Sequence, residues 1–398
     1  MKILGIETSC DETAASVVED GVKILSNVVV SQIDIFAEYG GVIPEVAARS
    51  HLEAMMPVVN KALSDAGCTW DDIDAIAVTH APGLLGSLLI GTLTARTLAI
   101  LHDKPLYAVH HLKSHVYANW LKTEESQSRS SSDTLKGARP SLRSSKDLDL
   151  AFPKFPVLAL VVSGGHTQIL YMPAHNQFEI VGTTRDDAVG ECFDKVAKIL
   201  GLPYPGGPAI AKAALEGDAD KYKLPHPKID GLDFSFSGLK TAVLRVVQKE
   251  LGLPISHPSH DLKNHLSPQQ VADFAASFQK TAVEILVEKM QKALERYPDV
   301  KSIVVAGGVS ANKALRNTFT FCLGPRPSGL SQRADGANSR AAALRNAPSQ
   351  NVNVFFPSPK LSGDNGAMVA AACYFEIQSG MKPVDPYVLN IYPRIEIN

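Results

Sequence analysis

The chain has 398 residues, of which 45% are hydrophobic and 20% are charged, and its formal net charge is −2. This composition is typical of a folded globular protein of about two domains, and it excludes disorder of the whole chain. Because 39 basic residues are balanced by 41 acidic ones, the net charge gives no general attraction to nucleic acid or to an anionic membrane. A nucleic-acid partner would therefore have to meet a local basic patch.

The cysteines and the N-terminus indicate where the protein works. The five cysteines are scattered and never form a Cys-x-x-Cys pair, which argues against a disulfide framework and a cysteine-rich zinc site. Met1 and Lys2 lead directly into an apolar strand and then into acidic residues, unlike a signal or transit peptide. Polar side chains within Leu84–Leu101 favour a buried helix over a membrane span. We therefore expect a cytoplasmic protein without a membrane partner.

Strand and helix patterns alternate along the chain, as in an α/β fold. Short apolar runs are the predicted strands: Lys2–Ile6, Ala14–Val18, Val157–Val162, Thr167–Met172 and Ser302–Ala306. Apolar residues at helical spacing predict these helices: Pro57–Ala66, Leu84–Leu101, Asp186–Leu200, Val271–Leu294, Ser310–Phe319 and Ala367–Phe375. The strand-turn-strand unit occurs twice, which predicts an internal duplication with two similar lobes facing a cleft.

Two polar segments, 124–150 and 324–350, interrupt this pattern. The first is rich in serine and the second in proline, glycine and arginine, so neither can offset its ordering entropy by apolar burial. We predict flexible insertions. Contact with RNA through their basic side chains is the less favoured alternative.

Three small-residue turns follow the apolar strands. Glu7–Thr13 combines hydroxyls with carboxylates, which can hold phosphate, a metal or an oriented water, although a plain polar hairpin tip has the same composition. Ser163–His166 has paired glycines that let a ligand approach the backbone. Gly307–Asn312 leads into a helix whose N-terminal amides favour anions, and Asn312 could bond to a nucleotide.

His111 and His115 are four residues apart on a predicted helix, a spacing with which a helix chelates a metal ion. Leu112 stands where a zinc metallopeptidase has its glutamate, so that reading lacks a general base. Asp364, at a turn before the helix Ala367–Phe375, is a candidate third ligand, and a helix N-cap is the equally good local alternative.

The segment Asp186–Lys195 places acidic residues and Lys195 on adjoining helical faces, for which a salt-bridged helix is the simple account. The chain has no G-x-x-x-x-G-K-[ST] and no G-x-S-x-G motif, which excludes a P-loop ATPase and gives no support to a serine hydrolase.

In chain order, these motifs resemble the family of tRNA threonylcarbamoyladenosine biosynthesis catalytic subunits (the TsaD family), formerly described as O-sialoglycoprotein endopeptidases. The resemblance covers nearly the whole chain through these segments: Gly5–Thr13, Gly40–Glu45, Ala81–Leu88, His110–His115, Val162–Thr167, Asp186–Lys195, Pro205–Pro208, Phe234–Lys240, Gly307–Asn312 and Asp364–Met368. It implies a two-lobed actin-like ATPase fold, a duplicated ribonuclease H-like α/β fold. The implied lobes are 1–112 with 365–398, and 113–364.

The resemblance also implies a function and a site. The expected enzyme is a metal-dependent acyltransferase that moves the threonylcarbamoyl group from threonylcarbamoyl-AMP to the adenosine 3′ of the anticodon, in tRNAs reading codons that begin with A, and releases AMP. The implied metal ligands are His111, His115 and Asp364, holding one divalent ion, Fe²⁺ first and Zn²⁺ as the alternative. The implied substrate residues are Val161, Val162, Ser163, Gly164, Gly165, Asp194, Gly207 and Asn312. Asp11, Glu12 and Glu191 are candidate catalytic bases, among which the sequence does not choose.

Implied partners are tRNA, a non-catalytic paralogue and the P-loop ATPase of the bacterial modification complex. Ser362 and Gly363 depart from the family pattern, which has Cys and a hydroxyl residue before the Asp-Asn pair. The alternative function is an actin-fold ATPase or kinase with a different substrate, which would use the three turns but would not need the histidines.

Overall fold

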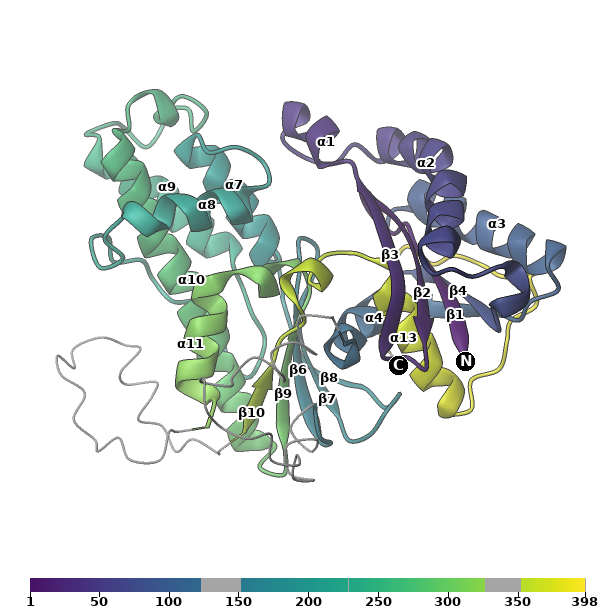
Figure 1. Cartoon of the computed structure of the whole chain (residues 1–398). Helices are drawn as coiled ribbons and strands as arrows, with labels where there is room; N and C mark the ends of the chain where they lie inside the picture. The colour runs from purple at the N-terminus through teal and green to yellow at the C-terminus, as the bar shows by residue number, and fades with distance from the viewer. Residues whose placement is uncertain (123–151, 228, 326–351, 398) are drawn as a thin grey trace, which may run out of the picture.

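The computed structural model describes residues 1–122, 152–227, 229–325 and 352–397. Within these ranges the chain forms two five-stranded sheets with helices packed on their faces (Figure 1). The strands of the first sheet are β1 (Lys2–Glu7), β2 (Glu12–Glu19), β3 (Lys23–Ser31), β4 (Ala75–Ala81) and β5 (Leu106–His110). The strands of the second sheet are β6 (Val157–Val162), β7 (Thr167–Met172), β8 (Glu179–Thr183), β9 (Ser302–Ala306) and β10 (Asn353–Phe355).

The two sheets have the same topology. The first has the order β3-β2-β1-β4-β5, and the second, taken from its other edge, has the equivalent order β8-β7-β6-β9-β10. In each sheet the leading strand pairs antiparallel with the next strand in sequence, and parallel with the fourth. This repeat confirms the predicted duplication and the two-lobed actin-like α/β fold.

The α-helices cover both sheets. Their bounds are α1 (Ile33–Tyr39), α2 (Pro44–Asp65), α3 (Leu85–Leu101), α4 (His111–Tyr117), α7 (Val189–Leu200), α8 (Gly206–Ala213), α9 (Ser237–Glu250), α10 (Pro268–Arg296), α11 (Lys313–Leu323) and α13 (Gly366–Gln378). Short 3-10 turns are η1 (Trp70–Asp72), η2 (Ala118–Trp120), η3 (Ala214–Glu216), η4 (Leu262–Asn264), η5 (Gly308–Ala311) and η6 (Pro359–Leu361). No helix among the described residues is long and apolar enough to cross a membrane.

Alternating side chains of the strands supply separate cores. In β1, Leu4 and Ile6 join a core with α2 and α3, whereas Ile3 joins a second core with α4 and α13. In β6, Leu158 belongs to the core under α7, α10 and α11, whereas Val157 faces the second core. Strand side chains alternate between faces, so the second core is shared by both sheets. The helices α4 and α13 therefore lie in the layer that joins the two lobes.

Several predicted helix starts are wrong. The helix α2 begins at Pro44, and Pro57, the predicted start, lies inside it. The helix α7 begins at Val189, after Asp186. The helix α11 begins at Lys313 because Asn312 is its N-cap. The predicted insertions, except Gly324 and Pro325, lie outside the described residues. The lobe limits 1–112 with 365–398 and 113–364 stay a prediction; they fall within α4 and just before α13.

Candidate metal centre and substrate site

The helix α4 directly follows β5, so the end of a buried strand fixes where its histidines lie. His111 and His115 are both buried, at 6% and 1% exposure, and their rings meet edge to face. His110 is directed elsewhere: it is the N-cap of α4, and its Nδ1 accepts from the backbone N–H of Leu112 at 3.3 Å. Burial lowers the pKa of His110 to about 3, so this ring is neutral.

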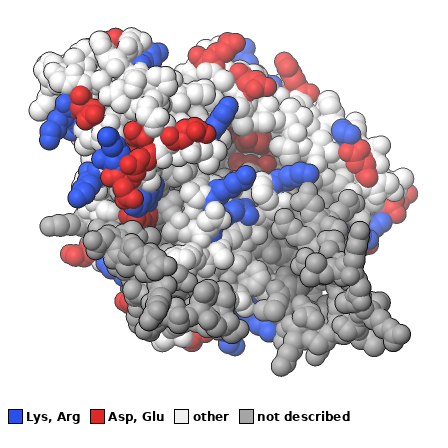
Figure 2. Space-filling model, turned by 60° about the vertical axis from the view of Figure 1, so that its left-hand side comes forward, with Lys and Arg blue, Asp and Glu red and all other residues white. Residues whose placement is uncertain are grey.

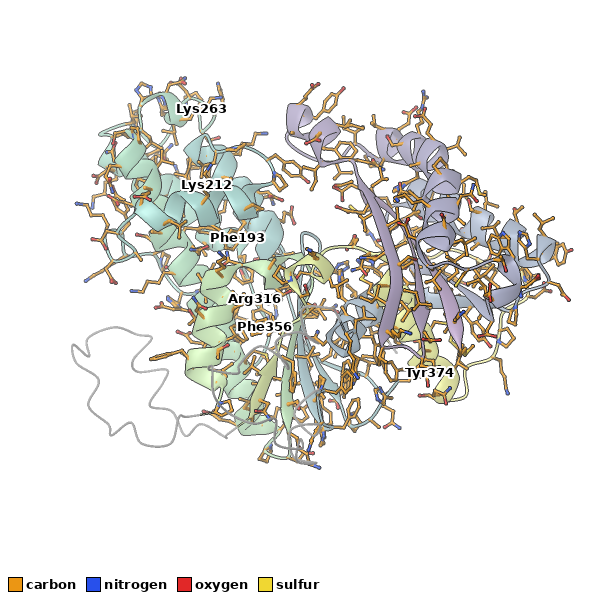
Figure 3. All side chains as sticks on the ribbon, viewed as in Figure 1. Phe193, Lys212, Lys263, Arg316, Phe356 and Tyr374 are labelled. Atoms are coloured by element: carbon orange, nitrogen blue, oxygen red, sulfur yellow. The ribbon has the colours of Figure 1, made fainter. Side chains whose placement is uncertain are left out.

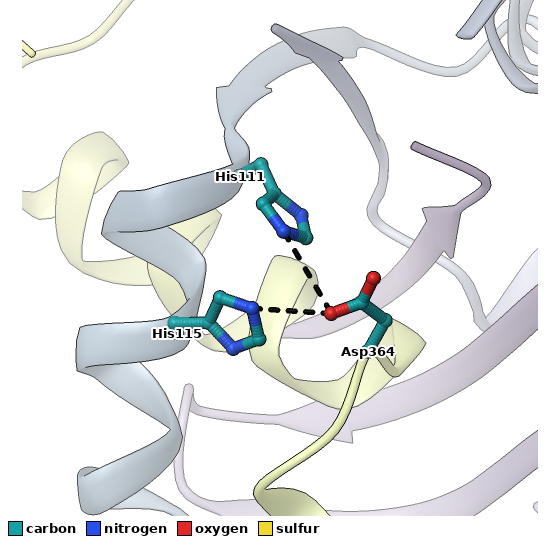
Figure 4. A group of neighbouring side chains, drawn as sticks. All are labelled: His111, His115 and Asp364. Carbon is teal, nitrogen blue, oxygen red and sulfur yellow. Dashed lines mark ion pairs between the residues drawn. The ribbon is translucent and has the colours of Figure 1, made fainter. Parts of the chain in front are cut away.

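Asp364 reaches these histidines from the segment before α13. Its Oδ1 lies 3.1 Å from His115 Nε2 and 3.7 Å from His111 Nε2 (Figure 4). Asn365, not Asp364, is the N-cap of α13, because its side chain accepts from the backbone N–H of Met368. The N-cap alternative for Asp364 is therefore wrong, and its carboxylate is directed to the imidazoles.

The three side chains fit a divalent metal ion. Their ligand atoms lie within 4.8 Å of one another. Two atoms bound to one tetrahedral ion at about 2.1 Å are roughly 3.4 Å apart, a value between the two observed distances. Both ring nitrogens of His115 are buried without a hydrogen-bond partner, although Nε2 faces the carboxylate. A buried imidazole without hydrogen bonds is costly, and coordination of a cation would satisfy it.

Glu7, at the end of β1, lies behind His111. Its Oε2 is 3.2 Å from His111 Nδ1 and accepts from Thr79 Oγ1 at 2.6 Å, while Oε1 accepts from the backbone N–H of Ser9 at 2.5 Å. A carboxylate on the second nitrogen of a ligating histidine fixes its tautomer and ring orientation. The sequence reasoning did not select Glu7 for this role.

The charged forms of His111 and Asp364 stabilise each other, although both side chains are largely buried. Burial acts to lower the pKa of His111, but Asp364 and Glu7 outweigh it and raise the pKa to about 9. Burial acts to raise the pKa of Asp364, but His111 and His115 outweigh it and lower the pKa to about 2. Without an ion, the ionised Asp364 therefore lies beside a protonated His111 at neutral pH, and a divalent cation would replace the proton of that ring when it binds.

Glycines let neighbouring elements pack against the first turn. A Cβ added at Gly91 of α3 would lie 2.2 Å from Thr8 Oγ1, and one added at Gly83 would lie 2.6 Å from the carbonyl oxygen of Ser9. Real Cβ atoms are not found so close, so only glycine fits at these positions. The turn is consequently held against α3, with Glu7 beside His111.

The second and third turns also meet. Gly307 has a φ of +88°, and a Cβ there would lie 2.4 Å from the carbonyl oxygen of Val162. A Cβ at Gly190 would lie 2.5 Å from the carbonyl oxygen of Ser163. Nothing lies within 4 Å of an added Cβ at Gly164 or Gly165. These two glycines therefore present open backbone, in contrast to the packed glycines around them.

The remaining predicted substrate residues differ in what they expose. The side chains of Val161 and Val162 are fully buried, so only their main chain can meet a ligand. Asp194 accepts from the backbone N–H of Gly206 at 2.7 Å, and burial raises its pKa. Gly207 faces open space. Asn312 caps α11, and its Nδ2 donates to Gln279 Oε1 at 2.7 Å, so its amide is already bonded within the fold.

The three candidate bases are placed differently. Asp11 is partly exposed and lies in the turn between β1 and β2. Glu191 is half exposed, and Lys195 Nζ lies 2.9 Å from its Oε1. Glu12 is more enclosed: burial raises its pKa well above the usual value, and the charges of Asp364 and Asp11 raise it further. The charge of Glu12 thus interacts with the candidate metal ligand Asp364. Glu191 instead forms a salt bridge within α7, as the simple account of this segment predicts.

His166, in the second turn, was also not selected from the sequence. Burial lowers its pKa to about 4, and the nearby charges of His111 and His115 act in the same direction. Those interactions connect the second turn to the candidate metal ligands. Its place in the Ser-Gly-Gly-His turn was the available signal, but nothing in the sequence joins that turn to residues far earlier in the chain.

The duplicated sheets, the open glycine turns and the buried His-His-Asp group define an enzyme of the actin-like ATPase fold with a candidate metal centre. The model of one family, described as tRNA N6-adenosine threonylcarbamoyltransferase (TsaD), matches residues 23–129 and 143–371. The chain belongs to this family, and it is a transferase.

Relatives of the same name support this assignment along the whole chain. The protein from Symbiobacterium thermophilum is 44% identical and is matched over 96% of this chain and 93% of its own length. The protein from Caldicellulosiruptor bescii is 42% identical, and the match covers 100% of this chain and 98% of that protein. The protein from Dehalococcoides mccartyi strain BAV1 is 43% identical, and the match covers 100% of this chain and 99% of that protein.

Proposed function

We propose that this chain transfers a threonylcarbamoyl group to tRNA with the help of a divalent metal ion held by His111, His115 and Asp364. The observation that carries the proposal is the convergence of these ligand atoms within 4.8 Å in a member of this transferase family. When bound, the ion supplies positive charge that polarises the carbamoyl or phosphate oxygens of the donor. Two imidazoles and a carboxylate suit Fe²⁺, with Zn²⁺ as the alternative.

The proposed donor is threonylcarbamoyl-AMP, and the proposed acceptor is the exocyclic amine of the adenosine 3′ of the anticodon in tRNAs reading codons that begin with A. The main chain of Ser163–Gly165 and of Gly207 would hold the donor, because Gly164, Gly165 and Gly207 leave their backbone open. Amide groups in such glycine turns bind phosphate. Asp194, within α7, and Asn312, at the N-terminus of α11, would border the adenylate.

Glu12 is the proposed proton acceptor for the attacking amine. A useful base has a pKa near the working pH, and burial with neighbouring carboxylates raises the pKa of Glu12 in that direction. Glu191 is a weaker choice because Lys195 pairs with its carboxylate. Asp11 is adjacent in sequence and would act on Glu12 through its charge.

tRNA is the macromolecular substrate that the family name implies, and the surface charge supports it. On the face in Figure 2, acidic side chains lie within a recess, and basic side chains border it. Basic groups around the recess can attract phosphates despite the net charge of −2. We propose a cytoplasmic location, where tRNA is modified.

We also propose that the chain works with a non-catalytic paralogue and a P-loop ATPase. Support for a protein partner comes from apolar side chains exposed on α3, where Leu85, Leu89 and Leu93 are 60%, 43% and 44% exposed. They recur every four residues and so share one face of the helix. Exposed apolar faces of this kind are typical of protein interfaces.

The test is transfer of label from preformed threonylcarbamoyl-AMP, made with radioactive threonine, to an unmodified tRNA that reads a codon beginning with A. Partner proteins are added, and wild type is compared with His111→Ala and Asp364→Ala. His102→Ala is the matched control, since His102 stacks on Trp70 away from the metal group. We expect both ligand variants to lose about a hundredfold or more in rate, and the control to match wild type.

Each outcome decides between functions. Label on tRNA that disappears with either ligand variant supports metal-dependent transfer. Transfer that is unchanged in both variants would refute the metal dependence while leaving the transferase. No label with any partner set, while the protein still hydrolyses ATP, would favour the alternative of an actin-fold ATPase or kinase with a different substrate.

A further inference from the structure

A second group of metal-ligating side chains lies in the described part of the chain, on the connection between α9 and α10. His257, Asp261 and His265 offer ligand atoms within 4.8 Å of one another. Asp261 Oδ2 lies 3.0 Å from His257 Nε2 and 3.1 Å from His265 Nε2. The group is separate from the motifs and the site described above.

The geometry of this group is close to that of a metal site. Two atoms bound to one tetrahedral zinc ion at about 2.1 Å are roughly 3.4 Å apart. Both nitrogen-oxygen distances are within a few tenths of an ångström of that value, and all three ligand atoms lie within 4.8 Å of one another, so side-chain movements would bring the three atoms around one ion. The ligands are also spaced by four residues each, which lets one short segment supply them all.

The carboxylate is oriented by a neighbour. Asn264 Nδ2 donates to Asp261 Oδ1 at 2.8 Å, which leaves Oδ2 directed to the two imidazoles. The backbone of the segment is fixed to the second lobe, because the side chain of Leu262 in η4 is fully buried in the core of that lobe. A ligand held by an outer hydrogen bond and a buried anchor is positioned before an ion arrives.

The connection between α9 and α10 is also fixed by contacts with α9 and with the end of α7. The buried side chain of Gln248 donates to the carbonyl oxygens of Ile255 and His257, both at 3.1 Å. A Cβ added at Gly201, which follows α7, would lie 2.6 Å from Lys263 Cβ, so η4 packs tightly on the end of that helix. Lys263 lies at the outer end of this lobe (Figure 3). The candidate ligands are thus carried by a fixed backbone.

We propose that His257, Asp261 and His265 bind one divalent transition-metal ion of the zinc type, and that the ion fastens the α9–α10 connection. Imidazole and carboxylate donors together suit such ions better than Mg²⁺ or Ca²⁺, which prefer oxygen ligands alone. The side chains are 19%, 38% and 45% exposed, so solvent can deliver the ion and complete its coordination with water. The site does not depend on the proposed transferase mechanism.

The experiment measures zinc binding to the full chain, without a histidine tag, in a His111→Ala/His115→Ala background. This background removes the first site, so any remaining tight zinc reports on the second. After treatment with a chelator, zinc is titrated by calorimetry, and bound zinc is counted after gel filtration. We expect one zinc per chain, and at least a hundredfold weaker binding when Asp261→Asn or His265→Gln is added.

His260→Ala is the matched control, because His260 lies on the same connection but outside the group. It should keep the single zinc. His265→Gln changes the most exposed of the three ligands, so it remains informative if Asp261→Asn fails to fold. Zinc should also raise the midpoint of thermal unfolding of the background protein and of the His260→Ala protein, and leave that of the His265→Gln protein unchanged.

Two results would overturn the proposal. One is a background protein that binds no zinc, which would leave the group as a hydrogen-bonded loop in which Asp261 accepts from both imidazoles. The other is zinc binding that persists at equal strength in both Asp261→Asn and His265→Gln. Neither result bears on transfer to tRNA, which is measured with the first site intact.

Discussion

At the scale of single residues, the candidate metal centre depends on a carboxylate that would not itself bind the ion. Glu7 holds His111 through its Nδ1 and is held in turn by Thr79 and Ser9. Removing the charge of Glu7 would leave Ser9 Oγ, at 3.1 Å, as the remaining partner of His111 Nδ1, so the tautomer and orientation of the ring would be fixed less firmly. Loss of a residue that hydrogen-bonds to a metal ligand commonly lowers metal affinity by roughly 10- to 100-fold.

Glu7→Gln should therefore weaken binding of Fe²⁺ or Zn²⁺ by about tenfold or more, because an amide is a poorer partner for the ring. Metal affinity of the chain is the measurement, with competition against a chelator of known strength. Glu191→Gln is the matched control, since Glu191 pairs with Lys195 instead. Equal affinity of Glu7→Gln and wild type would show that His111 needs no support from Glu7.

A second residue, Glu376 of α13, should make stability depend on pH. Burial raises its pKa to about 7, although Lys113, at 3.8 Å, acts to lower it. Because this pKa is above the ordinary value of 4.5, the folded state binds the proton more tightly than the unfolded state does. The contribution of the group to stability is then largest below pH 4.5 and is lost as pH rises to about 7.

Glu376→Gln removes this titration. The unfolding free energy of wild type, relative to that of the variant, should fall by on the order of 2–3 kcal/mol as pH rises from about 4.5 to about 7. Urea unfolding of both proteins at several pH values measures the difference. A difference that stays constant across this range would contradict the assignment of a raised pKa to Glu376.

At the scale of elements, α13 is pressed against β1 so closely that Gly5 has no room for a side chain. A Cβ at Gly5 would lie 2.2 Å from the carbonyl oxygen of Gly366 and 2.7 Å from the backbone nitrogen of Ala370. Both are backbone atoms, so the helix would have to move as a unit. Asp364 stands two residues before that helix and would move with it.

Gly5→Ala should accordingly lower the unfolding free energy by about 1–3 kcal/mol and weaken metal binding as well. Chemical denaturation and metal titration are measured on the same preparations. Gly41→Ala is the matched control, because nothing lies within 4 Å of a Cβ added there. Loss of stability with unchanged metal affinity would mean that Asp364 does not follow α13.

Comparison of the elements shows what the sequence could predict. The strands β6 and β7 have their predicted bounds, because apolar residues and a small-residue turn mark both ends. The start of α2 was missed because Pro57 resembles a first helical residue, yet the helix continues through it. The pair His111 and His115 was visible as a local spacing, whereas Glu7 was not, since it is 104 positions away and only folding brings it to the ring.

At the scale of the whole molecule, the candidate site lies where the two lobes are joined. The helix α4 supplies two of its side chains, and the segment before α13 supplies the third. Arg316 of α11 contacts the same segment before α13. Its guanidinium donates to the carbonyl oxygens of Ser310 and Pro357 at 2.6 and 2.7 Å and to Ser362 Oγ at 3.2 Å, and it lies over the ring of Phe356 (Figure 3).

Arg316 therefore connects the third turn, through Ser310, to the chain that carries Asp364. Ser362, which departs from the family pattern, takes part in this connection as a hydrogen-bond acceptor. Arg316→Lys keeps the charge but loses the planar fork that makes several bonds at once. We expect it to reduce metal affinity and the transfer rate together, roughly tenfold, since a bond from a charged donor contributes about 1.5–3 kcal/mol.

Ser362→Ala should have a smaller effect in the wild-type chain and none in the Arg316→Lys chain, because the two residues act through one bond. Metal affinity of the four proteins measures this coupling. Arg296→Lys is the matched control, as Arg296 lies over Tyr297 at the end of α10. If the effects of Arg316→Lys and Ser362→Ala simply add, Arg316 contributes to folding of α11 and does not position Asp364.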